Sequence, residues 1–206
     1  FDLEQPLEAK VMENLRRIYQ LDQPLWRQYA TYLGALLSGD LGPSYRQRGK
    51  NVQDIIFKQW PYSMRLGLLA MIFAVITGIP LGVIAALRQN SIVDYISLFF
   101  ATIGVSVPTF VIGLLVIIFF GTTLKWISIT NNDWNTWRPY LAPSLVLGLS
   151  TMSFITRITR STVLEVKRQD YIRTARAKGL SERMVIVRHI LRNAMIPVVT
   201  VLGPAL

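Results

Sequence analysis

Three long stretches without a charged residue constrain this chain more than any other feature. They cover residues 66–87, 95–124 and 139–156, and contain 22, 30 and 18 residues. The hydrocarbon core of a bilayer is about 30 Å thick and takes about 20 apolar helical residues to cross, so each stretch can span it. We therefore predict an all-α, polytopic membrane protein whose spans cover about 66–87, 96–120, 139–156 and, truncated, 195–206.

The two ends of the sequence suggest an interior fragment. The chain begins with Phe1 without a signal sequence, and the last apolar run, residues 193–206, stops after about half a span. We expect membrane segments to be missing at both ends.

Several classes of chemistry have no residues to support them. The chain has no Cys, and its one His, His189, lies in a strongly basic stretch, so we predict no disulfide and no metal site. The nearest match to a phosphate-binding loop, Gly42 to Asn51, has six residues between its glycines instead of four and lacks the final hydroxyl. We therefore predict no catalytic residue and no bound cofactor, and ATP would have to be bound by another chain.

Charges in the loops predict the sidedness of the spans. Residues 157–192 contain ten basic and three acidic residues, whereas residues 1–62 contain eight and seven. Because basic loops stay in the cytoplasm, 157–192 is predicted to lie inside, and alternation places 88–94 inside as well. Residues 1–62 and 125–138 are then outside, where aromatic residues of an interfacial belt gather: Trp126, Trp134, Trp137 and Tyr140.

The predicted domains are an extracytoplasmic helical region, 1–62, and a transmembrane domain, 63–206. Apolar residues at helical spacing predict amphipathic helices over 7–18 and from Pro24 to about Leu36, the second closed by the glycine-rich stretch 39–43. A third short helix is predicted from Val52 to Trp60, stopped by Pro61. The apolar faces fit a compact cap, which we favour, or a docking surface for an external partner.

Small and polar residues inside the spans have two interpretations. Gly78 and Gly82 form a step that permits close helix packing. Hydroxyl groups follow one face in each of the next two spans and fit either helix packing or a passage for a polar solute: Thr102, Ser106 and Thr109, then Ser144 and Thr151. No ionisable residue lies within the predicted spans, so an intramembrane ion pair has no candidate.

The inner loop 157–193 is predicted to form a helix, a glycine turn and a second helix. Residues 161–178 lack Gly and Pro and favour one helix, Gly179 ends it, and Ser181 can cap a helix from Glu182 to about Asn193. Such a basic loop could bind anionic lipid, or insert as an elbow into a soluble partner, which the small residues near its tip favour. A loop tethered to a bilayer is poorly placed for nucleic acid, so no nucleic-acid partner is expected.

The sequence of this loop resembles a known family. The stretch Tyr171-Ile172-Arg173-Thr174-Ala175-Arg176-Ala177-Lys178-Gly179-Leu180 is similar to the cytoplasmic loop of bacterial ABC importer permeases of the peptide and nickel group. So are Arg188 to Ala194 with Pro197, Gly39 to Ser44, and Val83 to Arg88. The resemblance covers nearly the whole chain and is strongest to the first permease of an oligopeptide importer. Arg173, Thr174 and Arg192 depart from the general importer pattern, as is typical of that subgroup.

The resemblance implies a fold, a function and partners. It implies one of a pair of permeases in the bacterial inner membrane, with two cytoplasmic ATPases that bind ATP and Mg, an external solute-binding protein, and surrounding membrane lipid. It also implies that the loop docks into the ATPase through eight residues: Asp170, Tyr171, Arg173, Ala175, Ala177, Lys178, Gly179 and Leu180. Oligopeptides or dipeptides are the expected cargo. The alternatives are a nickel or other small-solute importer of the group, and a non-transporting scaffold whose basic loop binds lipid.

Overall fold

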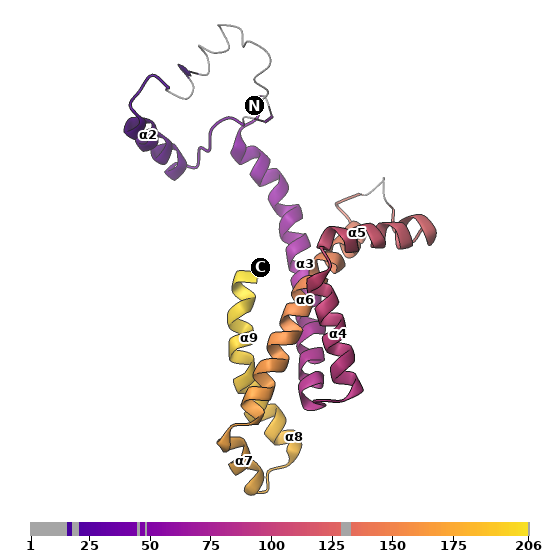
Figure 1. Ribbon diagram of the computed structural model, residues 1–206. Coiled ribbons are helices and arrows are strands. Elements are labelled where there is room, and N and C mark those ends of the chain that lie inside the picture. Colours follow the sequence, from indigo (N-terminus) through magenta and orange to yellow (C-terminus); the bar gives the residue numbers. More distant parts are fainter. Residues whose placement is uncertain (1–15, 18–20, 45, 48, 129–132, 206) are drawn as a thin grey trace. The chain divides into compact units, whose positions relative to one another are not determined.

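The computed structural model describes residues 16–17, 21–44, 46–47, 49–128 and 133–205. These residues form helices and no strand, as the predicted all-α class requires, with one isolated bridge between Pro43 and Asn51. The chain divides into two compact units, Phe1–Pro61 and Tyr62–Leu206. Figure 1 shows the helices in chain order.

The first unit contains α2, Leu25–Leu37, and the glycine turn that follows it. Gly39 and Gly42 have positive φ values of 82° and 74°, and the carboxylate of Asp40 accepts a hydrogen bond from the Gly42 amide at 2.9 Å. The predicted closure of this helix by residues 39–43 is therefore confirmed. No residue of α2 is buried by the described part of the chain, so the choice between a compact cap and a docking surface stays open. The helix predicted over 7–18 falls largely outside the described residues.

The predicted stop at Pro61 is wrong, because α3 runs unbroken over Val52–Leu87. A proline inside a helix removes one backbone donor, here the partner of the Phe57 carbonyl. This turn is exposed, so water can satisfy that carbonyl and the helix continues. At 36 residues, α3 is about 54 Å long and exceeds the roughly 30 Å that a span requires.

The second predicted span is broken. Helix α5, Thr109–Val116, continues into a π-helical segment, η1, Ile117–Thr123, and this stretch meets helix α4, Ile92–Ser106, at an angle of 102°. Pro108 lacks a donor and disfavours a helical conformation at Val107, whose ψ is 126°. Residues 96–120 therefore do not form the single straight helix that the sequence predicted.

The third predicted span lies within α6, Arg138–Lys167, which extends 11 residues past the predicted end at 156. The single helix predicted over 161–178 is also wrong, because the chain leaves α6 at Arg168 and starts α7, Asp170–Ala177, after an extended Gln169. In a straight helix, Val163 and Ile172 would lie about 180° apart, since each residue turns it by about 100°. The break allows both side chains to be buried in one cluster.

The last predicted span and the end of the inner loop form one continuous helical stretch. It consists of α8, Glu182–Met184, the π-helical segment η2, Val185–Leu191, and α9, Arg192–Ala205. There is thus a helix start at Glu182, as predicted, but no boundary near Asn193. Three helices in the described residues are long and apolar enough to cross a membrane, or four if the bent α4–α5 pair counts as one span.

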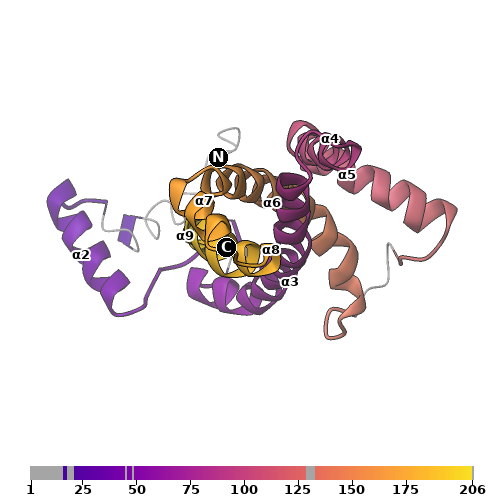
Figure 2. The same ribbon diagram turned by 90° about the horizontal axis from the view of Figure 1, so that it is seen from below.

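Close packing joins α3, α4 and α6 (Figures 1 and 2). A Cβ on Gly82 would lie 2.6 Å from the Thr156 carbonyl oxygen and a Cβ on Gly78 2.9 Å from that of Met152, so only glycine fits at either position. This confirms the predicted glycine step. The order of the two contacts also shows that α3 and α6 run parallel. Helix α4 runs antiparallel to α6, since Gly104 lies against Ser153 and Asp94 against Arg160. The α3–α4 turn and the α6–α7 turn therefore lie at the same end, as the predicted sidedness requires.

Candidate coupling hairpin

The end of the second unit that holds both turns carries a helical hairpin, residues 170–191, formed by α7, the Gly179 turn, α8 and η2. Gly179 has a φ of 77°, its amide donates to the Arg176 carbonyl at 2.9 Å, and the Leu180 amide donates to the Ala175 carbonyl at 3.4 Å. This pair of hydrogen bonds is the Schellman arrangement that ends a helix in a left-handed residue. The predicted glycine turn is confirmed.

A buried apolar cluster fixes the hairpin to three other helices. Ile172 and Val185 are fully buried and face α6, the end of α3 and the start of α9. The complete cluster consists of Ala86, Val163, Ile172, Ala175, Val185, Ile190 and Ala194. Because such interiors are close-packed, the hairpin cannot move without moving the ends of these helices.

The eight residues assigned to docking separate into two groups. Six are exposed on the outside of the hairpin: Asp170, Tyr171, Arg173, Ala177, Lys178 and Gly179. Ala175 is 7% exposed and Leu180 is half-buried, and both pack on the apolar cluster. The small side chain of Ala175 therefore serves contacts within this chain, and only the first group offers a surface to a partner.

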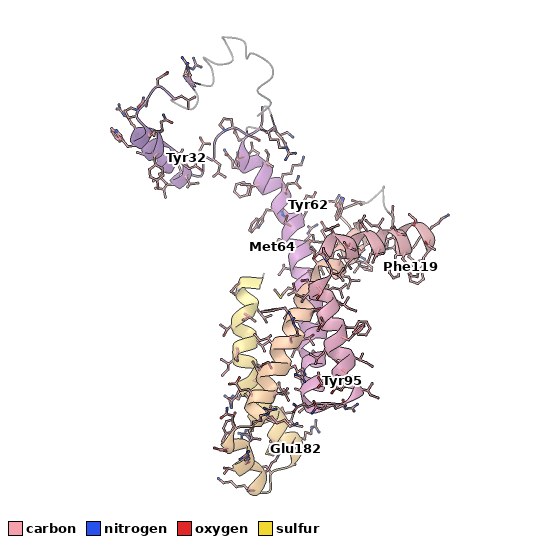
Figure 3. The ribbon with its side chains drawn as sticks, in the orientation of Figure 1. Tyr32, Tyr62, Met64, Tyr95, Phe119 and Glu182 are labelled. Carbon is pink, nitrogen blue, oxygen red and sulfur yellow. The ribbon has the colours of Figure 1, made fainter. Side chains whose placement is uncertain are left out.

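Polar contacts at the hairpin were not predicted from the sequence. The Arg176 guanidinium donates to both carboxylate oxygens of Glu182 (labelled in Figure 3), at 3.0 and 2.7 Å, across the Gly179 turn. These hydrogen bonds raise the pKa of Arg176 above its ordinary value. The Asn193 side chain donates to the Tyr171 hydroxyl at 2.8 Å and joins α7 to α9. The six-residue separation of Arg176 and Glu182 across a predicted turn could have suggested the first contact.

A second unpredicted contact lies deeper, between α4 and α6. Arg160 donates through Nε to one carboxylate oxygen of Asp94 at 2.6 Å and through Nη2 to the other at 2.8 Å. Asp94 is 1% exposed. The sequence offers no candidate ion pair within the predicted spans, because both residues lie just outside them. In the structure Arg160 lies in α6, which contains the third predicted span, and Asp94 lies in α4, which contains the first part of the second.

The hydroxyl groups predicted to line a passage do not form one stripe. Thr102 and Ser106 are exposed on α4, but the bend at Pro108 removes Thr109 from their face. Ser144 is buried and donates to the Tyr140 carbonyl, which is the packing alternative, and Thr151 is half-buried. In α6, Gly148 also serves packing, because its Cα faces Ala70 and Phe73 of α3.

At the opposite end of the second unit, a largely apolar cleft of about 1450 Å³ opens beside α6. Phe73, Phe120 and Leu145 line its apolar part, and Asp133 and Arg138 lie at its polar edge. Two residues of the predicted aromatic belt, Trp126 and Trp137, also border the cleft. The other two contact each other, since the Tyr140 hydroxyl donates to the Trp134 carbonyl at 2.9 Å.

These features define a multi-pass helical membrane protein with a packed helical hairpin at one end of its spans. The described residues contain no group of three or more side chains that could hold a metal ion. The family of binding-protein-dependent transport system inner membrane components matches residues 78–206, and this chain belongs to that family.

Relatives within the family are similar over nearly the whole chain. A dipeptide transport system permease protein of Bacillus subtilis is 42% identical over 203 residues, which are 98% of this chain and 65% of the relative. An oligopeptide transport system permease protein of Salmonella typhimurium is 40% identical over 207 residues, covering 100% of this chain and 67% of the relative. A dipeptide transport system permease protein of Lactococcus lactis is 39% identical over 193 residues, covering 94% and 63%. The chain thus spans about two thirds of the length of these relatives.

Proposed function

We propose that this chain is a permease subunit of an ATP-driven, binding-protein-dependent importer of oligopeptides or dipeptides in the bacterial inner membrane. Support comes from the family, from the names of its relatives and above all from the hairpin. Its exposed polar tip rests on a buried apolar cluster that reaches three helices. The partners we propose are a second homologous permease, two cytoplasmic ATPases and an external solute-binding protein.

In this proposal the chain makes and breaks no covalent bond. The ATPases bind ATP and Mg, and their closure pushes on the exposed face of α7 through Asp170, Tyr171, Arg173, Ala177, Lys178 and Gly179. The push reaches α6, α9 and the end of α3 through the cluster around Ile172. Coupling of this kind requires two global states that the ATPases bind with different affinity.

The hydroxyls of Thr102 and Ser106 are proposed to face the cargo path. Both residues lie on an exposed face of α4, which the second permease would oppose. We propose the apolar face of α2 as the surface nearest the solute-binding protein, because the described residues leave it uncovered.

Cysteine cross-linking tests the docking proposal directly, because the chain contains no native Cys. Ala177→Cys in the full-length protein places a thiol on the exposed face of α7, and Ala175→Cys, two residues away and buried, is the matched control. With ATPases that carry groove cysteines, Ala177→Cys is expected to cross-link with a yield that changes with ATP. The control is expected to cross-link poorly.

Absence of any cross-link, with the Ala177→Cys thiol still modified by a water-soluble maleimide from the cytoplasmic side, would overturn the proposal and favour the lipid-binding scaffold. Salt provides a second criterion. Attraction of a basic loop to anionic lipid weakens steeply with screening, whereas a packed helix in a groove is expected to survive about 1 M salt.

A further inference from the structure

The buried contact between Asp94 and Arg160 joins two segments that are 66 residues apart in the chain. Asp94 lies in the first turn of α4, where Ser91 caps the helix by accepting a hydrogen bond from the Asp94 amide at 3.4 Å. The Asn90 amide, at a residue with a φ of 62°, donates to the same carboxylate at 2.9 Å. The carboxylate thus holds the α3–α4 turn, the start of α4 and the side of α6 together.

Stability alone is a weak explanation for this contact. Burying two charges costs free energy that their attraction often only offsets, and apolar residues of similar volume at such a site are frequently neutral or stabilising. A bidentate pair of arginine and carboxylate does, however, fix the orientation of both partners more narrowly than apolar contacts do. The geometry therefore favours a role in holding α4 in one position on α6.

The surroundings of Arg160 connect this position to the hairpin. Thr159 packs against Gly82 of α3, Arg160 binds Asp94 of α4, and Val163 belongs to the apolar cluster under the hairpin. One turn and a half of α6 thus contacts α3, α4 and the hairpin cluster. Farther along, Gly104 of α4 lies against Ser153 of α6, so α4 is held at two levels.

We propose that Asp94 and Arg160 are a positioning pair that makes α4 move with α6 when the hairpin is displaced. This inference rests on the proposed function, since it concerns how movement of the hairpin reaches Thr102 and Ser106 on α4. Without the pair, α6 can follow the hairpin while the inner end of α4 stays behind. ATP hydrolysis would then continue with fewer peptides transported per ATP.

The test separates folding from coupling by removing each of the two charges alone and then both together. Arg160→Met leaves the carboxylate of Asp94 buried and unpaired, whereas Asp94→Asn leaves Arg160, whose side chain is 20% exposed and can turn toward water. Arg160→Met is therefore expected to lower the abundance of folded protein more than Asp94→Asn does. The double variant Asp94→Asn/Arg160→Met removes both charges and is expected to regain much of that abundance.

Coupling is measured as peptide transported per ATP hydrolysed by the complete complex in proteoliposomes. The double variant is expected to lose about fivefold or more of this ratio despite its recovered abundance. Arg157→Met is the control for losing an arginine from α6, because Arg157 lies on an exposed face of the same helix and its replacement changes the net charge as Arg160→Met does. It is expected to retain the wild-type ratio.

A wild-type ratio in the double variant would overturn the inference, and so would an equal loss in Arg157→Met. If the double variant does not reach the membrane, Arg160→Lys tests the same point, since it keeps the charge and loses the planar fork. A lower ratio in that variant supports the inference, and an unchanged one overturns it. Failure of the wild-type complex to transport peptide would instead overturn the proposed function.

Discussion

Two sharp turns of the second unit, between α4 and α5 and between α6 and α7, lead into segments that differ in what they bury. After the first turn, α5 has no buried residue and η1 has only Gly121. After the second, α7 buries Ile172 and Ala175 against the cluster beneath the hairpin. Both turns interrupt apolar or helix-forming sequence, yet only the second leads into a packed element.

The causes of the two turns differ as well. Pro108 favours the first through its missing donor and through its effect on Val107, so this cause is local to the backbone, although α3 shows that a proline alone need not end a helix. No proline or glycine lies between Lys167 and Asp170, and the second turn exists because Val163 and Ile172 cannot otherwise share one cluster. A turn fixed by packing can transmit force, since displacing the element strains everything packed against it.

The largest expected effect concerns the exposed tip of the packed hairpin. A Cβ on Gly179 would meet nothing within 4 Å, so Gly179→Asp creates no clash within this chain, and aspartate tolerates positive φ better than most residues. The variant is therefore expected to insert and fold but to lose about tenfold or more of peptide uptake, because the added charge and volume obstruct docking. Uptake and abundance measured in the same cells provide the comparison.

Gly179→Asn is the control for this variant, since it has the same volume and tolerance of positive φ without the charge. A smaller loss in Gly179→Asn assigns the effect to charge, and an equal loss assigns it to volume at the tip. Normal peptide uptake by Gly179→Asp at normal abundance would contradict docking through this turn.

The second prediction compares the packed segment with the open one. Ile172→Ala removes a fully buried side chain and is expected to destabilise the fold by about 2–5 kcal/mol. Leu115→Ala removes a side chain of α5 that is 60% exposed, and is expected to change stability by less than about 0.5 kcal/mol. Thermal unfolding of both variants in one detergent measures the difference. Similar melting temperatures would show that the two segments are packed alike.

The third prediction tests the causes assigned to the α4–α5 turn and the α6–α7 turn. Pro108→Ala restores a backbone donor and allows α4 and α5 to approach a straight helix. Spin labels at Phe99 and Leu115, both exposed, are closer together at the 102° bend than they would be in a straight helix. In Pro108→Ala the distance between them is expected to increase toward about 24 Å, the length of 16 residues of straight helix.

The matched substitution at the other turn is Gln169→Ala. Alanine favours a helix more than glutamine does, but packing of Ile172 fixes this turn, so distances between α6 and α7 are expected to stay unchanged. Straightening in Gln169→Ala, or an unchanged bend in Pro108→Ala, would reverse the assignment of cause.

This comparison also explains which features the sequence could predict. Three features follow from the residues themselves and are found as predicted: the turn at Gly179, the packing step at Gly78 and Gly82, and the helix start at Glu182. The α6–α7 turn depends on contacts between distant residues, and residues 161–178 contain nothing that stops a helix. The pair Asp94 and Arg160 depends on the register of two antiparallel helices. The capping pattern of Ser91 and Asp94 is a local signal that could have located the start of α4, but it does not predict the partner of Asp94.

The smallest expected effect concerns the exposed contact that closes the hairpin. Glu182→Gln removes the charge that Arg176 binds on the other side of the Gly179 turn. Both side chains are more than one third exposed, so the pair contributes only about 0.2–1 kcal/mol and less at high salt. Because the apolar cluster already fixes the hairpin, Glu182→Gln is expected to retain coupling and to lower the melting temperature slightly at low salt. A loss of coupling as large as that of Gly179→Asp would show that the hairpin is held by its ion pair and not by packing, and would remove the difference drawn between the two turns.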